Sequence, residues 1–145
     1  MREISAERIT ETIARLCMEA NILLPQDVRE RIAEKRSEEN WPSACEILDR
    51  ITENYKIAES ENLPICQDTG VACVFLEIGQ DLHINGDIEK AVNAGVKKGY
   101  TEGFLRKSVV GDPLERVNTG DNGGTPRSWG GVVGYATSTS VITSV

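Results

Sequence analysis

Three chemically different side chains stand side by side in residues 63–70, whose sequence is Leu-Pro-Ile-Cys-Gln-Asp-Thr-Gly. Cys66 offers a thiol, Gln67 an amide and Asp68 a carboxylate. The flanking proline and glycine hold such a loop in an extended and then turned path, so that its side chains can converge on one point. The stretch is therefore a candidate ligand loop. Residue types alone leave one alternative open, a buried and inert cysteine beside an ordinary Asp-Thr-Gly turn.

A second candidate segment begins after Phe104, where helical periodicity gives way to a long loop with repeated glycine. Loops that combine arginine and glycine can cradle an anion. Arg106 is the candidate cation, because the planar donors of a guanidinium match a carboxylate. The alternative is that Arg106 and the neighbouring Lys107 are solvated loop charges.

Helices must position both segments. Apolar residues at helical spacing predict amphipathic helices over about 5–21, from Pro25 onward, from Pro42 to about Ala58, and from about Ile88 to Gly99 or Gly103. Residues 71–78 are β-branched, aromatic and apolar, and predict a largely buried strand. We therefore expect an α+β fold, a predominantly helical domain with a small strand region and a Gly-rich C-terminal tail.

Composition narrows the class of protein. The 145 residues suffice for one domain, and the net charge of -7 argues against nucleic-acid or anionic membrane partners. The chain begins with an amphipathic pattern rather than an apolar signal segment, which predicts a cytoplasmic protein. The four cysteines have no zinc-site spacing and are expected to be free thiols, with Cys73 structural in the predicted strand. The single histidine, His83, falls in a polar connection and is assigned no chemistry.

Three motifs taken together resemble one enzyme family. They are Pro-Ile-Cys-Gln-Asp-Thr-Gly at residues 64–70, Arg-Lys-Ser at 106–108 and Arg-Val-Asn-Thr-Gly-Asp-Asn at 116–122. In order and spacing they are similar to the N-terminal region of the alpha subunit of class I (iron-sulfur) fumarate hydratases and L-tartrate dehydratases. The resemblance implies a hydro-lyase that reversibly hydrates a C4 dicarboxylate, fumarate to malate, or dehydrates tartrate.

The same resemblance implies a [4Fe-4S] cluster with one open iron, and it implies roles for the candidate residues. Cys66 would be one of three metal ligands, Gln67 would bind substrate, Asp68 would handle a proton, and Arg106 would hold a substrate carboxylate. Thiolates are the ligands such clusters need, and an open iron acts as a Lewis acid. Proton removal beside a carboxylate builds up negative charge that a fixed arginine stabilises.

The sequence departs from the family pattern after Asn122. The family runs directly from Asn-Thr-Gly-Asp-Asn into Thr-Pro, whereas two glycines intervene here, and residues 128–145 carry no charge. We therefore divide the chain into 1–122, the N-terminal part of a hydro-lyase catalytic domain, and 123–145, a Gly/Ser/Thr/Val-rich tail that does not match the family. A shifted reading frame or an artificial addition would account for this tail.

The family's two further cysteine ligands are expected beyond the matching region, and Cys17, Cys45 and Cys73 do not match them. We expect the chain to supply one cluster ligand of three and to be inactive alone. Its expected partners are a C4 dicarboxylate, a beta subunit or C-terminal domain, and other chains in an oligomer. The alternative is a non-catalytic interaction module derived from the family, which would bind its partner through the tail. A small electron-transfer iron-sulfur protein is disfavoured, because it would need four closely spaced thiolates.

Overall fold

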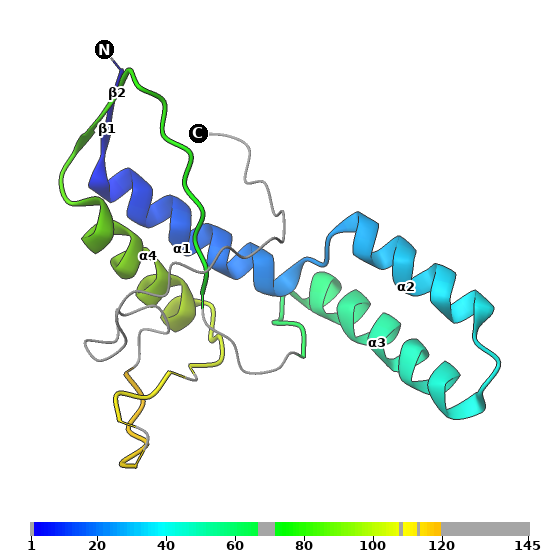
Figure 1. The fold of residues 1–145 in the computed structure, drawn as a ribbon. Coiled ribbons are helices and arrows are strands. Elements are labelled where there is room, and N and C mark those ends of the chain that lie inside the picture. The colour runs from blue at the N-terminus through cyan, green and yellow to red at the C-terminus, as the bar shows by residue number, and fades with distance from the viewer. Residues whose placement is uncertain (1, 67–71, 108, 113, 120–145) are drawn as a thin grey trace.

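The computed structural model describes residues 2–66, 72–107, 109–112 and 114–119. The elements follow in the order β1 (Arg2–Ser5), α1 (Ala6–Ile22), α2 (Gln26–Glu38), α3 (Pro42–Glu61), β2 (Leu82–Asn85) and α4 (Ile88–Glu102). Helices α1 and α4 lie side by side with the strands at one end, and α2 and α3 form a hairpin beyond the other end of α1 (Figure 1). The predicted mainly helical α+β fold is confirmed.

The core lies between α1 and α4. Four side chains from the facing sides of the two helices have at most 5% of their surface exposed: Ile13, Ala14, Ala91 and Val96. Leu105, just beyond α4, is equally buried. This apolar stripe is the one that the spacing of the sequence predicts for α1 and α4, because side chains three and four residues apart share one face of a helix.

Two glycines let the backbones of α1 and α4 approach closely. A Cβ atom added to Gly95 would lie 2.7 Å from the carbonyl oxygen of Thr10, and one added to Gly99 would lie 2.7 Å from that of Ala14. The hydroxyl of Thr10 donates a 3.0 Å hydrogen bond to the carbonyl of Ala91 across the same interface. A larger residue at either glycine would therefore push the helices apart.

The sheet is short and parallel. β1 pairs with β2 in the register Arg2↔Leu82 to Ser5↔Asn85. Each strand leads into a helix through a capping side chain, since Ser5 accepts from the N–H of Arg8 at the start of α1 and Asp87 accepts from the N–H of Lys90 at the start of α4. The strand pair thus brings the first turns of α1 and α4 together.

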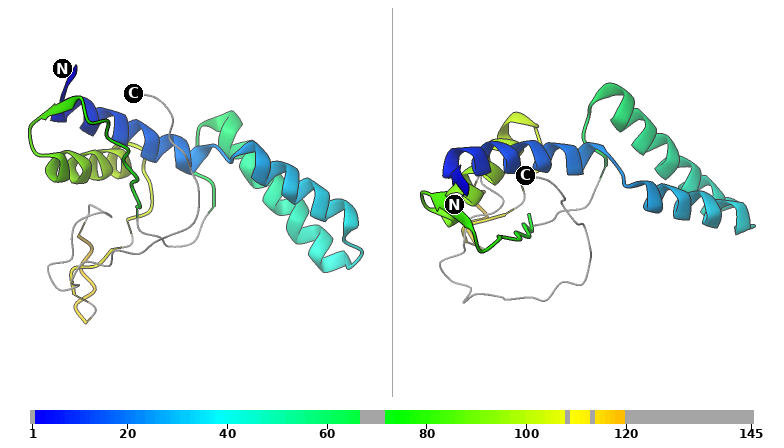
Figure 2. Two further views of the ribbon diagram at one scale, coloured as in Figure 1. Left: turned by 45° about the horizontal axis from the view of Figure 1, so that its top comes forward. Right: turned by 90° about the horizontal axis from the view of Figure 1, so that it is seen from above.

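Charged side chains join α2 to α3. Arg36 donates two hydrogen bonds to the carboxylate of Asp49, at 2.7 and 3.0 Å. Arg29 donates to Glu59 at 2.7 Å and lies over the ring of Tyr55, 5.4 Å from its centroid. Figure 2 shows from two further sides that this hairpin projects away from the α1–α4 pair.

The predicted helices are confirmed, with small differences at their ends. Pro25 occupies the N-cap position immediately before α2 rather than its first turn, and α2 extends to Glu38. Pro42 begins α3, and α4 ends at the capping residue Gly103. Among the described residues, no helix is long and apolar enough to cross a membrane. The tail, residues 123–145, lies outside the described part of the chain.

The strand predicted over 71–78 is wrong where it can be judged. Residues 72–79 form no strand, and Phe75, Leu76 and Ile78 each leave about half of their surface exposed. A strand needs a hydrogen-bonding neighbour, and β1 pairs instead with the next segment, β2. Cys73 is consequently exposed rather than structural in a strand. His83, predicted in a connection, belongs to β2.

Candidate functional site

The segment that carries Cys66 leaves α3 through a left-handed residue. Asn62, with φ 54°, ends the helix, and the N–H of Leu63 donates back to the carbonyl of Ala58 at 3.0 Å. The chain then crosses to α1, where the N–H of Ile65 donates to the carbonyl of Asn21 at 2.8 Å. The backbone is therefore fixed on two helices before it reaches the cysteine.

Cys66 is exposed, and its backbone is held by a side chain. Its N–H donates a 3.0 Å hydrogen bond to the Oδ1 atom of Asn54, which lies on α3. Cys66 is exposed, which contradicts the buried position in the alternative interpretation. Gln67 and Asp68 follow directly in sequence, but both lie outside the described residues, so their predicted roles stay predictions.

An open groove of about 720 Å³ leads along α3 to this cysteine. Its lining is mostly apolar, and Asn54, Ile65 and Cys66 form part of it. The groove also contains Ile47 and Ile51, which leave 59% and 42% of their surfaces exposed. In the apolar stripe predicted for α3, the buried residues are Tyr55 and Ala58, near the end of the helix.

Arg106 emerges directly from the core. Leu105 is 4% exposed, and its N–H donates to the carbonyl of Tyr100 at 3.1 Å, so the chain beyond α4 is anchored one residue before the arginine. Phe104, the residue before Leu105, has a left-handed φ of 52° and leaves 90% of its surface exposed. Arg106 itself is exposed and makes further interactions within the chain. The backbone is thus anchored to α4 immediately before the arginine.

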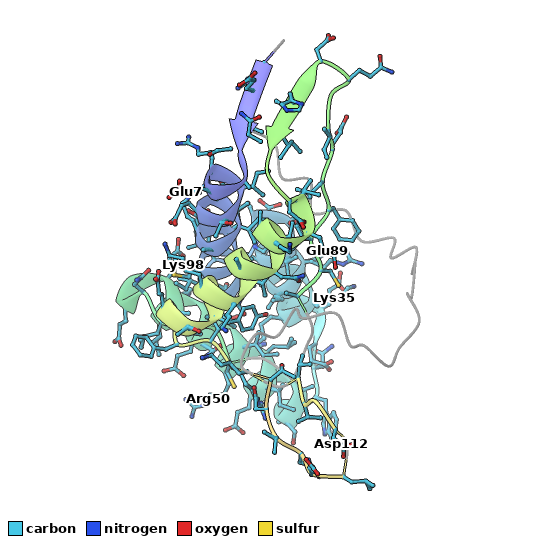
Figure 3. All side chains as sticks on the ribbon, turned by 90° about the vertical axis from the view of Figure 1, so that its left-hand side faces the viewer. Glu7, Lys35, Arg50, Glu89, Lys98 and Asp112 are labelled. Carbon is cyan, nitrogen blue, oxygen red and sulfur yellow. The ribbon has the colours of Figure 1, made fainter. Side chains whose placement is uncertain are left out.

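The chain beyond Arg106 doubles back as a narrow turn. Val110 pairs with Asn118 in an antiparallel bridge, and the side chain of Asn118 donates to the carbonyl of Lys107. Asp112 lies at the far end of this turn (Figure 3). The backbone N–H groups of Glu115 and Leu114 hold the pKa of Asp112 below its ordinary value.

Both candidate segments are supported by the second half of α1. A Cβ atom on Gly103, at the end of α4, would meet the side chain of Met18 at 2.7 Å, while Ile65 is bonded to Asn21 one turn further along. The segment before Cys66 and the end of α4 before Arg106 therefore contact neighbouring turns of α1, although Cys66 and Arg106 are 40 residues apart in sequence.

The thiols do not assemble into a metal site on their own. All four cysteines are free, as the sequence predicts, and among the described residues no three Cys, His, Asp or Glu side chains gather to hold a metal ion. Cys17 is half-buried in α1, where desolvation raises the pKa of its thiol. The thiol of Cys45 donates to the carbonyl of Glu39 at 3.3 Å. Among the described residues, the exposed cysteines are Cys66 and Cys73.

Sequence reasoning missed the supports of the Cys66 loop. Asn21 and Asn54 lie on helices well before the loop, and nothing in their local sequence indicates a long-range contact. The one available signal for Asn54 is its position four residues before Ala58, on the helical face that turns out to be covered.

Comparison with known proteins gives consistent matches over the helical part of the chain. The sequence model of the fumarate hydratase (Fumerase) family matches residues 10–130. A protein of Methanocaldococcus jannaschii, provisionally named L(+)-tartrate dehydratase subunit alpha, is 40% identical over 119 residues, which is 81% of this chain and 41% of that protein.

Two further relatives match the same region. A protein of Geobacillus stearothermophilus, provisionally named fumarate hydratase class I, is 35% identical over 80% of this chain and 22% of its own length. The L(+)-tartrate dehydratase subunit alpha of Escherichia coli K12 is 24% identical over 88% of this chain and 42% of its own. The chain thus spans less than half the length of these relatives.

Proposed function

Because this chain belongs to the fumarate hydratase family, we propose that it forms the N-terminal part of an iron-sulfur hydro-lyase acting on a C4 dicarboxylate. The observation that carries the proposal is the exposed Cys66, at the end of a loop that two helices hold in place. A [4Fe-4S] cluster would supply Lewis-acid chemistry for the hydroxyl and carboxylate groups of the substrate. Cys66 would provide one of its ligands, and the remaining ligands would come from sequence outside the described residues.

The other proposed roles belong to this chain's own side chains. Arg106 would bind a substrate carboxylate, since its guanidinium is exposed directly after a buried anchor. Gln67 would bind the substrate beside the cysteine. Asp68 would accept or return the proton at the carbon next to a carboxylate, which requires that its surroundings tune its pKa.

We propose that catalysis needs a second component. The relatives in M. jannaschii and E. coli are named alpha subunits, which favours a beta subunit as the partner, and the longer class I relative favours a further domain of the same chain. We also propose that the assembled enzyme is an oligomer and that it is located in the cytoplasm. The present chain by itself would be inactive, because it supplies one of three cluster ligands.

A chimeric alpha subunit tests this proposal. Residues 10–122 of this chain replace the matching segment of the M. jannaschii protein, which is then assembled with its beta subunit and supplied with iron and sulfide without oxygen. We expect hydration of fumarate or dehydration of tartrate, abolished by Cys66→Ser. Cys73→Ser is the matched control, because Cys73 is also exposed but lies outside the loop. Activity that survives Cys66→Ser would overturn the role of this thiol.

An interaction module is the second candidate, and the exposed apolar side chains along α3 favour it. A chimera that folds but stays inactive would support this reading over the catalytic one. An active chimera would exclude it for residues 10–122.

A further inference from the structure

We propose that Asn54 is the residue that positions Cys66. The Oδ1 atom of Asn54 accepts the backbone N–H of Cys66 at 3.0 Å and so ties the candidate ligand to α3, twelve residues earlier. The importance of this contact for a cluster rests on the proposed function, whereas the contact itself does not. Asn54 touches the backbone of the cysteine and not the reacting atoms, so it is a positioning residue.

Within the described part of the chain, the N–H groups of Leu63, Ile65 and Cys66 donate hydrogen bonds, and the acceptor for Cys66 is a side chain. The N–H groups of Leu63 and Ile65 donate to the backbone carbonyls of Ala58 and Asn21, which any residue would supply. The N–H of Cys66 has the side-chain oxygen of Asn54 as its partner. The identity of residue 54 therefore decides whether the last of these bonds forms.

The surroundings of Asn54 favour a lasting contact. The residue is half-buried, and it comes directly before Tyr55 and four residues before Ala58, which are 8% and 2% exposed. α3 is thus packed around Asn54, although its first half leaves apolar side chains exposed. A side chain on a packed turn loses little further freedom when it accepts a hydrogen bond, so the bond can fix the loop efficiently.

The location of the bond explains what it would do. Cys66 is the proposed cluster ligand, and it directly precedes Gln67 and Asp68 in sequence. Asn54 also lines the groove that reaches Cys66. A ligand that must meet a metal within a few tenths of an ångström needs such support from a residue outside the first contacts.

Hydrogen exchange of the Cys66 amide in the intact 145-residue chain tests the contact. In Asn54→Ala we expect this amide to exchange about 2- to 13-fold faster, the ratio that corresponds to one hydrogen bond of 0.5–1.5 kcal/mol. In Asn54→Asp the exchange should stay slow, because a carboxylate oxygen also accepts the bond. Thr52→Ala is the matched control on the same helix, since the hydroxyl of Thr52 donates to the carbonyl of Leu48 within α3 rather than to the Cys66 segment among the described residues.

Loss of folding does not explain the expected result. Alanine favours a helix more than asparagine does, so Asn54→Ala should leave α3 intact by circular dichroism. Unchanged exchange of the Cys66 amide in Asn54→Ala would overturn the proposal, as would equally fast exchange in Thr52→Ala.

Iron retention separates this proposal from the proposed function. In the assembled chimera we expect Asn54→Ala to lose iron to a chelator faster than the unchanged protein, with Asn54→Asp closer to it. If Cys66→Ser retains iron as well as the unchanged chimera, the proposed function fails, while amide exchange still decides the role of Asn54. If Asn54→Ala and Thr52→Ala lose iron equally, Asn54 does not act through the cysteine.

Discussion

The α1–α4 pair and the α2–α3 hairpin both consist of two helices side by side, yet different interactions hold them. The first pair buries apolar side chains and brings two glycines against the opposite backbone. The second is joined by the ion pairs of Arg29 and Arg36, with no fully buried residue in α2. The α1–α4 pair thus forms the apolar core, whereas the α2–α3 hairpin leaves apolar side chains exposed.

The two helix pairs therefore suit different tasks. The α1–α4 pair can support site residues, and the α2–α3 hairpin can contact another surface. The segments that lead into both candidate loops contact the second half of α1, which belongs to the well-packed region. The groove that reaches Cys66 belongs to the open one. A rigid base can hold site residues in place, while an open apolar face is suited to contact with another surface.

The largest expected effect is a cavity in the well-packed region. Ile13→Ala removes a side chain that is 4% exposed, and we expect the free energy of unfolding to fall by about 2–5 kcal/mol. Ile57→Ala, on the 43% exposed Ile57 of α3, should cost far less and is the matched control. Urea unfolding followed by circular dichroism measures both. Equal losses would contradict the contrast between the two regions.

The next effect tests the close approach of the backbones. Gly99→Ala places a Cβ atom 2.7 Å from the carbonyl oxygen of Ala14 and 2.8 Å from the Cβ of Cys17. We expect a net loss of about 1 kcal/mol or more, although alanine alone would favour the helix by a similar amount. Gly79→Ala meets nothing within 4 Å and serves as the control. A higher melting temperature for Gly99→Ala would show that the helices are further apart.

The same contrast explains which features the sequence predicts. The four helices follow from local signals, namely apolar spacing, Pro25 and Pro42 at helix starts, and the capping residue Asp87. The strand predicted over 71–78 fails because its residue types suit a strand, but no described segment pairs with residues 72–78. Strand formation depends on a neighbour far away in sequence, and β2 occupies that place beside β1.

The candidate site likewise combines residues that the sequence predicts with supports that it does not. Cys66 and Arg106 are recognisable from their motifs, and the structure finds both exposed beside anchored residues. The supports Asn21 and Asn54 act across 44 and 12 residues of sequence, so no local pattern reveals them. The incomplete cover of α3 at Ile47 could not be predicted either, because periodicity indicates which face is apolar and not what packs against it.

A smaller effect is expected on the stability of the α2–α3 hairpin at acidic pH. Arg36 holds the pKa of Asp49 below its ordinary value, chiefly through their hydrogen bonds. A carboxyl whose pKa is lowered by folding stabilises the fold above its unfolded pKa, and that contribution is lost as the pH falls through the folded pKa. We therefore expect the protection of α2 and α3 amides, relative to exchange in an unfolded chain at the same pH, to fall on acidification towards that pKa. Asp49→Asn should reduce this pH dependence, and an unchanged profile would contradict the ion pair's role.

The smallest expected effect is on the open face of α3. Ile47 is 59% exposed, so Ile47→Ala should change the free energy of unfolding by no more than about 0.5 kcal/mol. Burial, not residue type, decides the cost, which is why the same Ile→Ala change at position 13 should be several times more damaging. Urea unfolding at low protein concentration compares the two. A loss above about 1 kcal/mol at Ile47 would mean that this face is covered in solution, and the two helix pairs would then be alike.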